Sequence, residues 1–125
     1  MTRLFTPLEA NRTLPLVQRI VADILEKGQR LRKLVREPED RDVRLQISDL
    51  ERDLHALLKE LHAIGCDYKD AGFEQGLVDF PAKIEDEDVY LCWRSDEDSI
   101  TWYHPVREGF AGRRKIPAAL LAGEG

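Results

Sequence analysis

The sequence predicts an α+β fold: an antiparallel helical hairpin, coiled-coil-like in its pattern, followed by a small antiparallel β-sheet of three to four strands. Apolar residues recur in steps of three and four through the first half of the chain, which is typical of helices. In the second half they alternate over short runs divided by glycine, proline and acidic residues, which is typical of strands. The 125 residues fit a single domain, with the hairpin at about 7–64, the sheet at about 66–116 and a fraying tail at 117–125.

The hairpin is predicted from two apolar series that occupy the a and d positions of a heptad repeat. The first series runs from Leu14 to Val35, and the second runs from Val43 to Ile64. Residues Glu37–Asp40 form a short polar break between them. The two helices should therefore lie antiparallel and pack along these series.

Three sequence signals mark where the helices begin and end. Thr6 and Glu9 have the spacing of a capping box, and Gly65 stands where a left-handed C-cap is needed. Pro15 would interrupt a helix running through it, because its ring clashes with the carbonyl one turn earlier. We therefore predict a short turn over residues 7–11 and a second helix start just before Pro15.

The apolar surface of the hairpin is wider than its own seam can cover. Four residues widen it on flanking positions: Ile20, Leu25, Leu34 and Leu58. Leaving several such side chains in water is costly, at about 25 cal/mol per Å² of apolar surface. The rest of the chain, a second copy of it, or both should therefore pack on these residues. We expect self-association through these residues, with a dimer favoured, and Gly28 would allow the close approach of another backbone.

Short apolar runs in the second half are predicted to pair as strands. They are Leu77–Phe80, which should stop at Pro81, then Val89–Arg94 and Ile100–His104, with Cys66–Lys69 as a fourth strand. Side-chain alternation assigns their residues to two faces, and the apolar sets of paired strands should share one of them. The predicted apolar face carries Val78, Phe80, Val89, Leu91, Trp93, Ile100, Trp102 and His104. The predicted polar face carries Asp79, Tyr90, Cys92, Arg94, Thr101 and Tyr103.

The polar face of this sheet could bind a small ligand. We take Asp79, Tyr90, Arg94 and Tyr103 as candidate ligand-binding residues. An arginine can clamp a carboxylate or a phosphate while tyrosine hydroxyls orient it. The alternative is an ion pair between Asp79 and Arg94 on a half-exposed face, or a contact between subunits.

Cys92 and His104 are candidate metal ligands, together with Asp79 and with Glu9 or Glu74 as a fourth partner. The predicted faces weigh against this site, because Cys92 and His104 would lie on opposite sides of the sheet. The same argument weighs against a thiolate–imidazole pair for catalysis. The alternative is a small buried cysteine and a histidine satisfied at the edge of the core.

Arg113 follows the segment Gly109–Gly112 and precedes two further basic residues. Such a segment could form a backbone nest that contacts a phosphate or RNA, so we add Arg113 to the candidate ligand-binding residues. The alternative is that the glycines permit a tight turn and Phe110 fills the core.

Composition excludes several classes of protein. The net charge of −5 argues against a surface built for nucleic acid, and no apolar run approaches the length of a membrane span. Two cysteines are too few for a disulfide scaffold and favour a reducing, cytoplasmic location. No nucleophile elbow, phosphate loop or dinucleotide fingerprint occurs. We therefore expect no membrane partner, and the sequence names neither a catalytic residue nor a cofactor.

Several motifs occur in an order that resembles a known family. They are Phe5-Thr6-x-x-Glu9-Ala10-Asn11, Leu14-Pro15-Leu16-Val17, Gly76–Pro81, Val89–Arg94, Trp102-Tyr103-His104 and Gly109–Arg113. From Phe5 to about Ile116 the chain resembles the bacterial domain of unknown function 2203. The resemblance implies a single-domain, cytoplasmic bacterial protein and supplies no activity.

These observations support two functional hypotheses. The first is a non-enzymatic interaction module that self-associates through the hairpin. The alternative is a small-ligand or metal-binding domain, which could be enzymatic and would use the polar face of the sheet.

Overall fold

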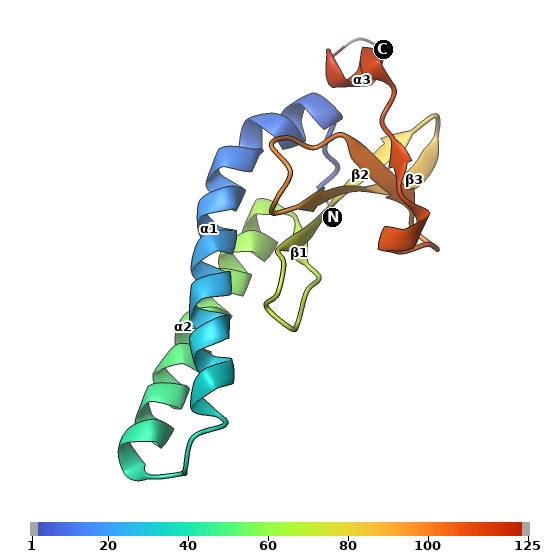
Figure 1. Cartoon of the computed structure of the whole chain (residues 1–125). Helices are drawn as coiled ribbons and strands as arrows, with labels where there is room; N and C mark the ends of the chain where they lie inside the picture. Colours follow the sequence, from blue (N-terminus) through green and yellow to red (C-terminus); the bar gives the residue numbers. More distant parts are fainter. Residues whose placement is uncertain (1–2, 124–125) are drawn as a thin grey trace.

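The structure is a computed structural model that describes residues 3–123, and it places two long helices beside an antiparallel sheet (Figure 1). The helices are α1 (Pro7–Leu34) and α2 (Arg41–Ile64). The strands are β1 (Asp67–Tyr68), β2 (Leu77–Ile84), β3 (Glu87–Arg94), β4 (Trp102–Pro105) and β5 (Arg114–Lys115). The 3-10 helix η1 (Phe110–Gly112) precedes β5, and the short helix α3 (Ala118–Leu121) follows it. The predicted α+β fold is confirmed, and the sheet has five strands where three to four were predicted.

The predicted capping box of α1 and the predicted glycine cap of α2 are both present, and α2 has an N-cap that was not predicted. The Thr6 hydroxyl accepts a hydrogen bond from the Glu9 amide at 3.1 Å, and the Glu9 carboxylate accepts one from the Thr6 amide at 3.0 Å. The Asp40 carboxylate caps α2 by accepting the Val43 amide at 2.8 Å. Gly65 ends α2 with a φ of 111°, a left-handed conformation that favours glycine.

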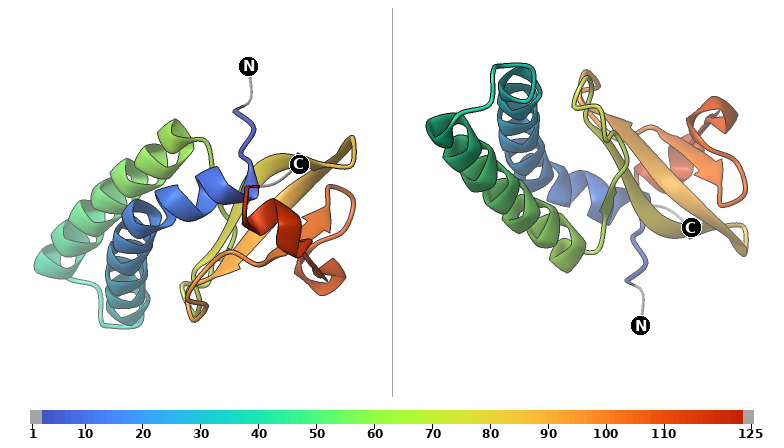
Figure 2. Two further views of the ribbon diagram at one scale, coloured as in Figure 1. Left: turned by 90° about the horizontal axis from the view of Figure 1, so that it is seen from above. Right: turned by 90° about the horizontal axis from the view of Figure 1, so that it is seen from below.

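The predicted interruption near Pro15 is wrong. Helix α1 runs without a break from Pro7 to Leu34 with Pro15 inside it, and its first turns run at an angle to the rest (Figure 2). A proline removes one helical hydrogen bond and bends a helix without necessarily ending it. The bent segment is held by Asn11, whose side chain exchanges hydrogen bonds of 2.8 and 3.0 Å with the backbone of Ile100.

The strands form a meander in the order β1-β2-β3-β4-β5, and one face of this sheet packs on the hairpin. The core joins both layers: Ile24 and Leu61 of the helices are buried with Phe80, Leu91 and Trp93 of the sheet. The predicted inner faces of β2 and β3 are therefore confirmed.

Strand β2 does not stop at Pro81, as was predicted, but continues to Ile84. Strand β1 pairs with β2 only as far as Asp79, so at Pro81 this edge of β2 has no strand that would need the missing N–H. The Pro81 carbonyl instead accepts the Phe5 amide at 2.7 Å. The N-terminal segment is thereby tied to the edge of the sheet.

The side chains of β4 lie on the opposite faces of the sheet from those predicted, and this places His104 on the same face as Cys92. Strand β4 pairs Tyr103 with Leu91 of β3 and Trp102 with Cys92. Directly paired residues share a face, so Tyr103 points to the core. Trp102 and His104 therefore lie with Cys92 on the outer face, opposite to the prediction.

The β4 side chains were assigned to the wrong faces for a physical reason that lies at Ile100. This residue is buried, but it lies before β4 and outside the ladder, where Asn11 holds its backbone. Because Ile100 is not part of the strand, counting alternate residues from it does not show which β4 side chains face the core. On the outer face, the Trp102 ring is covered by Arg113, whose guanidinium carbon lies 5.0 Å from the ring centroid, and by Lys115, whose amine lies 4.4 Å from it.

The sheet covers only part of the hairpin, and the loop end of the hairpin extends beyond it (Figure 1). Among the residues predicted to widen the apolar stripe, Ile20 is buried in the chain's own core and Leu25 packs half-buried against it. Leu34 is half-buried, and Leu58 is 37% exposed. The chain itself therefore covers the half of the stripe that lies nearest to the sheet.

Gly28 makes room for a side chain of the same chain. A Cβ atom on Gly28 would lie 2.2 Å from Cγ of Phe73, which belongs to the connection between β1 and β2. Gln29 and Arg32 of α1 hold this connection by donating to the carbonyls of Phe73 (3.0 Å) and Gly72 (2.8 Å).

Two predictions near the C-terminus are also wrong. Residues 118–121 of the tail form α3, and Leu120 and Leu121 pack against the core; residues 124–125 lie outside the described part of the chain. Phe110 does not fill the core but is 39% exposed. Within residues 3–123, no helix has both the length and the apolar character that crossing a membrane requires.

Candidate functional site

Three chemically different side chains converge on the outer face of the sheet. Asp79 on β2 is paired with Cys92 on β3, and His104 on β4 is paired with Tyr90, two residues before Cys92. One carboxylate oxygen of Asp79, the Cys92 Sγ and one ring nitrogen of His104 all lie within 4.8 Å of one another. All three side chains are buried, with Asp79 5% and His104 4% exposed. We call this group the Asp–Cys–His cluster.

The hydrogen bonds of His104 fix the direction of its ring. Its Nδ1 lies 2.9 Å from the backbone carbonyl of Pro105. A carbonyl can only accept, so Nδ1 carries a proton and donates it. Its Nε2 lies 3.3 Å from the Asp79 carboxylate, to which it donates a hydrogen bond when it carries a proton; without that proton, Nε2 has a free lone pair. A histidine that binds a metal through Nε2 commonly has its other nitrogen held by a carbonyl in this way.

Burial disfavours negative charge on this cluster. It raises the pKa of Asp79, an effect that the nearby His104 and Lys69 oppose. It also raises the pKa of the Cys92 thiol to about 11, with a further contribution from the Asp79 charge. The thiol is therefore protonated at neutral pH unless a cation binds beside it.

The cluster does not have the geometry of a cysteine–histidine–aspartate catalytic triad. In a triad, one ring nitrogen faces the nucleophile and the other faces the carboxylate. Here the Pro105 carbonyl occupies Nδ1 of His104, and Asp79 and Cys92 both lie near a single ring nitrogen. Convergence of three donors on one point is instead the arrangement that a metal ion requires.

The donor set and its spacing suit a zinc-like ion. Zinc binds histidine nitrogen, cysteine sulfur and carboxylate oxygen at about 2.0–2.3 Å, which places tetrahedral ligands roughly 3.3–3.8 Å apart. The distance of 3.3 Å between Nε2 of His104 and Oδ1 of Asp79 falls in that range, and the two distances to the Cys92 Sγ are at most 4.8 Å. Three protein ligands would leave one coordination position free, as in catalytic zinc sites.

Arg113 lies behind Cys92 and is held inside the molecule. Its Nη2 donates to both carboxylate oxygens of Glu97 (2.7 and 2.9 Å) and to the Cys92 carbonyl (3.1 Å). Its Nε is buried and has no hydrogen-bond partner among the described residues. The guanidinium lowers the pKa of the Cys92 thiol through its charge and through a side-chain hydrogen bond. Arg113, predicted as a ligand-binding residue, is thus placed to stabilise a thiolate at Cys92.

The remaining predicted ligand-binding residues have different positions. The Tyr90 ring packs against the His104 ring on the outer face, with centroids 5.6 Å apart. Arg94 pairs with Asp96 and not with Asp79. Tyr103 lies on the core side and takes no part in the outer face.

Neither glutamate predicted as a fourth metal partner joins the cluster. The Glu9 carboxylate caps α1, and this hydrogen bond with Thr6 lowers its pKa. Glu74 lies 3.8 Å from Arg32 on an exposed part of the β1–β2 connection.

A cavity of about 400 Å³ opens over the Asp–Cys–His cluster. Its other lining residues are Lys69, Leu77, Tyr90, Val106, Glu108, Gly109 and Phe110. Lys69 was not among the residues predicted for the site. Alternation from Asp67, which pairs with Asp79, could have placed Lys69 on the same outer face.

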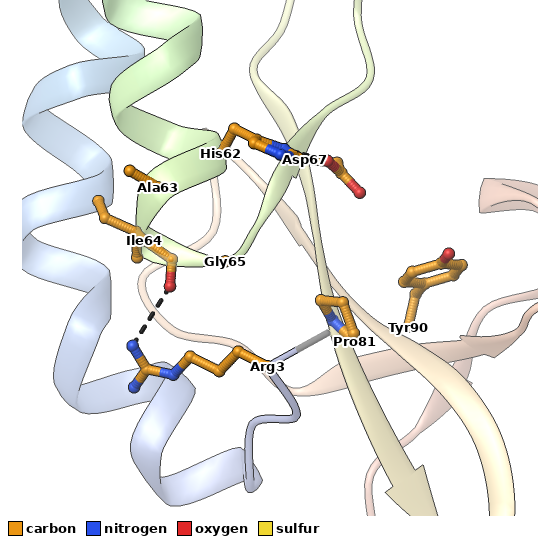
Figure 3. Close-up of a pocket in the computed structure, with 8 residues that line it drawn as sticks. All are labelled: Arg3, His62, Ala63, Ile64, Gly65, Asp67, Pro81 and Tyr90. Atoms are coloured by element: carbon orange, nitrogen blue, oxygen red, sulfur yellow. Dashed lines mark hydrogen bonds and ion pairs between the residues drawn. The ribbon is translucent and has the colours of Figure 1, made fainter. Parts of the chain in front are cut away.

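A second cavity of about 590 Å³ also borders Tyr90 (Figure 3). Its charged side chains already have partners. Arg3 points away from Tyr90 and donates to the Ile64 carbonyl at the end of α2 at 3.2 Å, and His62 lies 3.8 Å from Asp67. The buried donors that could hold an ion lie in the first cavity, so we place the candidate site there.

Fold and site together define an α+β domain whose outer sheet face carries a buried Asp–Cys–His cluster beneath a cavity. A comparison with models of protein families identifies the family. Residues 3–116 match the family described as "Uncharacterized conserved protein (DUF2203)", so the chain belongs to this family and the resemblance is confirmed. Comparisons with curated proteins and with solved structures gave no match.

Proposed function

We propose that this protein is a metal-binding domain in which Asp79, Cys92 and His104 hold a zinc-like divalent ion. The observation that carries the proposal is the convergence of a carboxylate oxygen, a thiol and a ring nitrogen within 4.8 Å in a buried position. Mixed nitrogen, oxygen and sulfur donors favour zinc or a similar transition metal over calcium or magnesium, which prefer oxygen alone.

Two features around the cluster support this proposal. A bound cation would compensate the burial of Asp79, which otherwise raises the pKa of that carboxylate. It would also convert the Cys92 thiol to a thiolate, which the charge of the nearby Arg113 guanidinium would stabilise. The free coordination position would face the cavity, where the ion could bind or polarise a small ligand.

The test is metal content and the spectrum of the cobalt form. Untagged protein purified without chelators should contain about one zinc ion per chain by elemental analysis. Replacement by Co²⁺ should give the absorption bands of a tetrahedral site with a thiolate ligand. The variants Cys92→Ser and His104→Gln should lose these bands.

The chain offers a matched control in Cys66→Ser. Cys66 is also a buried free cysteine, but its Sγ donates to the Leu61 carbonyl at 3.5 Å and it belongs to the core. This variant should bind Co²⁺ like the wild type, and circular dichroism should show that all variants fold. Absence of a thiolate–cobalt band in the wild type would refute the proposal, as would a Cys92→Ser variant that retains the metal.

A second proposed function is self-association through the part of the hairpin that the sheet does not cover. Support comes from two of the predicted residues: Leu34 is half-buried and Leu58 is 37% exposed. Light scattering coupled to gel filtration should give the mass of a dimer, and Leu58→Glu should give a monomer. Leu16→Glu, on the helix segment near the sheet and 46% exposed, is the control and should leave the dimer intact. A wild-type protein that stays monomeric at high micromolar concentration would contradict this second proposal.

We also propose a bacterial cytoplasmic location. Support comes from the two cysteines, which are free and buried and so need no oxidising compartment. Fractionation of cells expressing the natural gene would test this location.

A further inference from the structure

The cavity above the Asp–Cys–His cluster has a lining of two kinds. Three of its residues are apolar, and we call them the apolar wall: Leu77, Val106 and Phe110, of which Val106 is 50% and Phe110 39% exposed. Lys69 and Tyr90 also line the cavity, and Lys69 lies beside Leu77 on the neighbouring strand. A ligand that reaches the ion would therefore contact both a positive charge and hydrocarbon.

Lys69 supplies the uncompensated positive charge of this cavity. Its amide donates to the Leu77 carbonyl at 2.8 Å, which continues the β1–β2 ladder and keeps Lys69 on the outer face. Its amine lies 5.8 Å from the centroid of the Tyr90 ring, and the charge lowers the pKa of Asp79. Among residues 3–123, no carboxylate forms a salt bridge with this amine.

Two carboxylates also lie near this cavity. Asp67 lines the second cavity, lies 3.8 Å from His62, and raises the pKa of Asp79 through its charge. Glu108, which lines the cavity above the cluster, accepts a hydrogen bond from Arg114 at 3.1 Å. A divalent ion would be balanced by the carboxylate of Asp79 and the thiolate of Cys92. Among the residues that line this cavity, the charge left over is then that of Lys69, and it favours an anion.

Phe110 is held in place as part of the apolar wall. The guanidinium carbons of Arg113 and Arg94 lie 4.6 and 5.6 Å from the centroid of its ring. Arg113 is in turn fixed by Glu97. The exposed ring is therefore positioned over the cavity by contacts that do not include a ligand.

We infer that the free coordination position takes the carboxylate of a small organic acid, with Lys69 pairing with that carboxylate and the acid's hydrocarbon part lying against Leu77, Val106 and Phe110. This inference rests on the proposed metal site and names its ligand class. Inorganic phosphate fits less well, because a dianion needs several donors and the cavity offers a single free amine.

The experiment uses the full-length chain loaded with Co²⁺ and follows the visible bands of the ion. Acetate, hexanoate and inorganic phosphate are titrated separately. Hexanoate should bind at least about tenfold more tightly than acetate, because its additional methylene groups leave water for the apolar wall. Phosphate should bind more weakly than hexanoate.

Two variants and one control connect the binding to the named residues. Lys69→Gln should weaken both carboxylates by about tenfold or more, whereas Phe110→Ala should weaken hexanoate and leave acetate unchanged. Lys83→Gln removes another exposed amine of the sheet that does not line this cavity, and it should bind all three anions like the wild type.

The outcomes separate this inference from the proposal on which it rests. If the cobalt spectrum is absent, the metal site is refuted and the inference is refuted with it. If the spectrum is present but Lys69→Gln binds carboxylates like the wild type, or phosphate displaces hexanoate at equal concentration, the metal site stands and the inference is refuted.

Discussion

Replacing Gly28 by alanine tests the packing between α1 and the β1–β2 connection. In an ordinary helix interior, alanine stabilises by about 1 kcal/mol relative to glycine. Here the new Cβ would lie 2.2 to 2.6 Å from three carbons of the Phe73 ring, which forces the ring to move. Overpacking of this kind costs about 1–3 kcal/mol. The ring cannot shift easily, because Gln29 and Arg32 hold the connection at the carbonyls of Phe73 and Gly72.

We therefore expect Gly28→Ala to lower the free energy of unfolding, by an overpacking cost that outweighs the helix gain. In a Phe73→Ala background the clash is gone, and the same change should raise the free energy of unfolding by about 1 kcal/mol. Urea unfolding of the four proteins, followed by circular dichroism, measures both effects. If Gly28→Ala stabilises the chain equally with and without the Phe73 ring, the inferred contact is wrong.

Three further predictions concern stability. Burial raises the pKa of the Cys66 thiol from 9.0 to about 12. Above pH 9 the folded chain keeps a proton that the unfolded chain loses, so the free energy of unfolding should fall by about 1.4 kcal/mol per pH unit until about pH 12. Urea unfolding at pH 8 and pH 10.5 should show this loss in the wild type and a smaller one in Cys66→Ala; equal losses would contradict it. Arg113→Ala leaves the largely buried Glu97 carboxylate without its cation and should destabilise by about 3 kcal/mol or more, measured by the same method, whereas an effect near zero would show that the pair is not formed. Thr6→Ala removes the capping hydroxyl of α1 and should cost about 1 kcal/mol; Thr13→Ala, which removes a hydroxyl bonded only to the preceding helical turn, is its control and should cost less.

The sequence predicted those elements whose determinants are local. The Thr6–Glu9 capping box, the Gly65 cap and the apolar seam each depend on residues within a few positions of one another. The structure confirms them, except that Val35, the last residue of the first series, lies beyond α1 and is 60% exposed. The inner faces of β2 and β3 were also predictable, because in each strand the large apolar residues occupy alternate positions and so lie on one face.

The candidate site was predicted in its residues but not in its arrangement. Asp79, Cys92 and His104 were all selected from the sequence, yet the predicted register placed His104 on the wrong face. In the segment from Ile100 to His104, bulky residues occupy both even and odd positions, so each face of the strand would carry some of them. Local alternation therefore could not choose between the two registers.

The sequence by itself determined the fold class, the start of the first helix at its capping box and the end of the second at Gly65, because helix caps and a heptad seam act over one or two turns. It did not determine that α1 continues through Pro15. Only the tertiary structure decided which ionisable side chains meet. Asn11, far from Ile100 in sequence, holds that residue outside the β4 ladder, and Arg113 and Lys115 cover Trp102 on the outer face. These contacts between distant segments set the parity of β4, and a shift of one residue in a strand moves every side chain to the other face. His104 consequently lies beside Asp79 and Cys92, and the three side chains form a single candidate metal site.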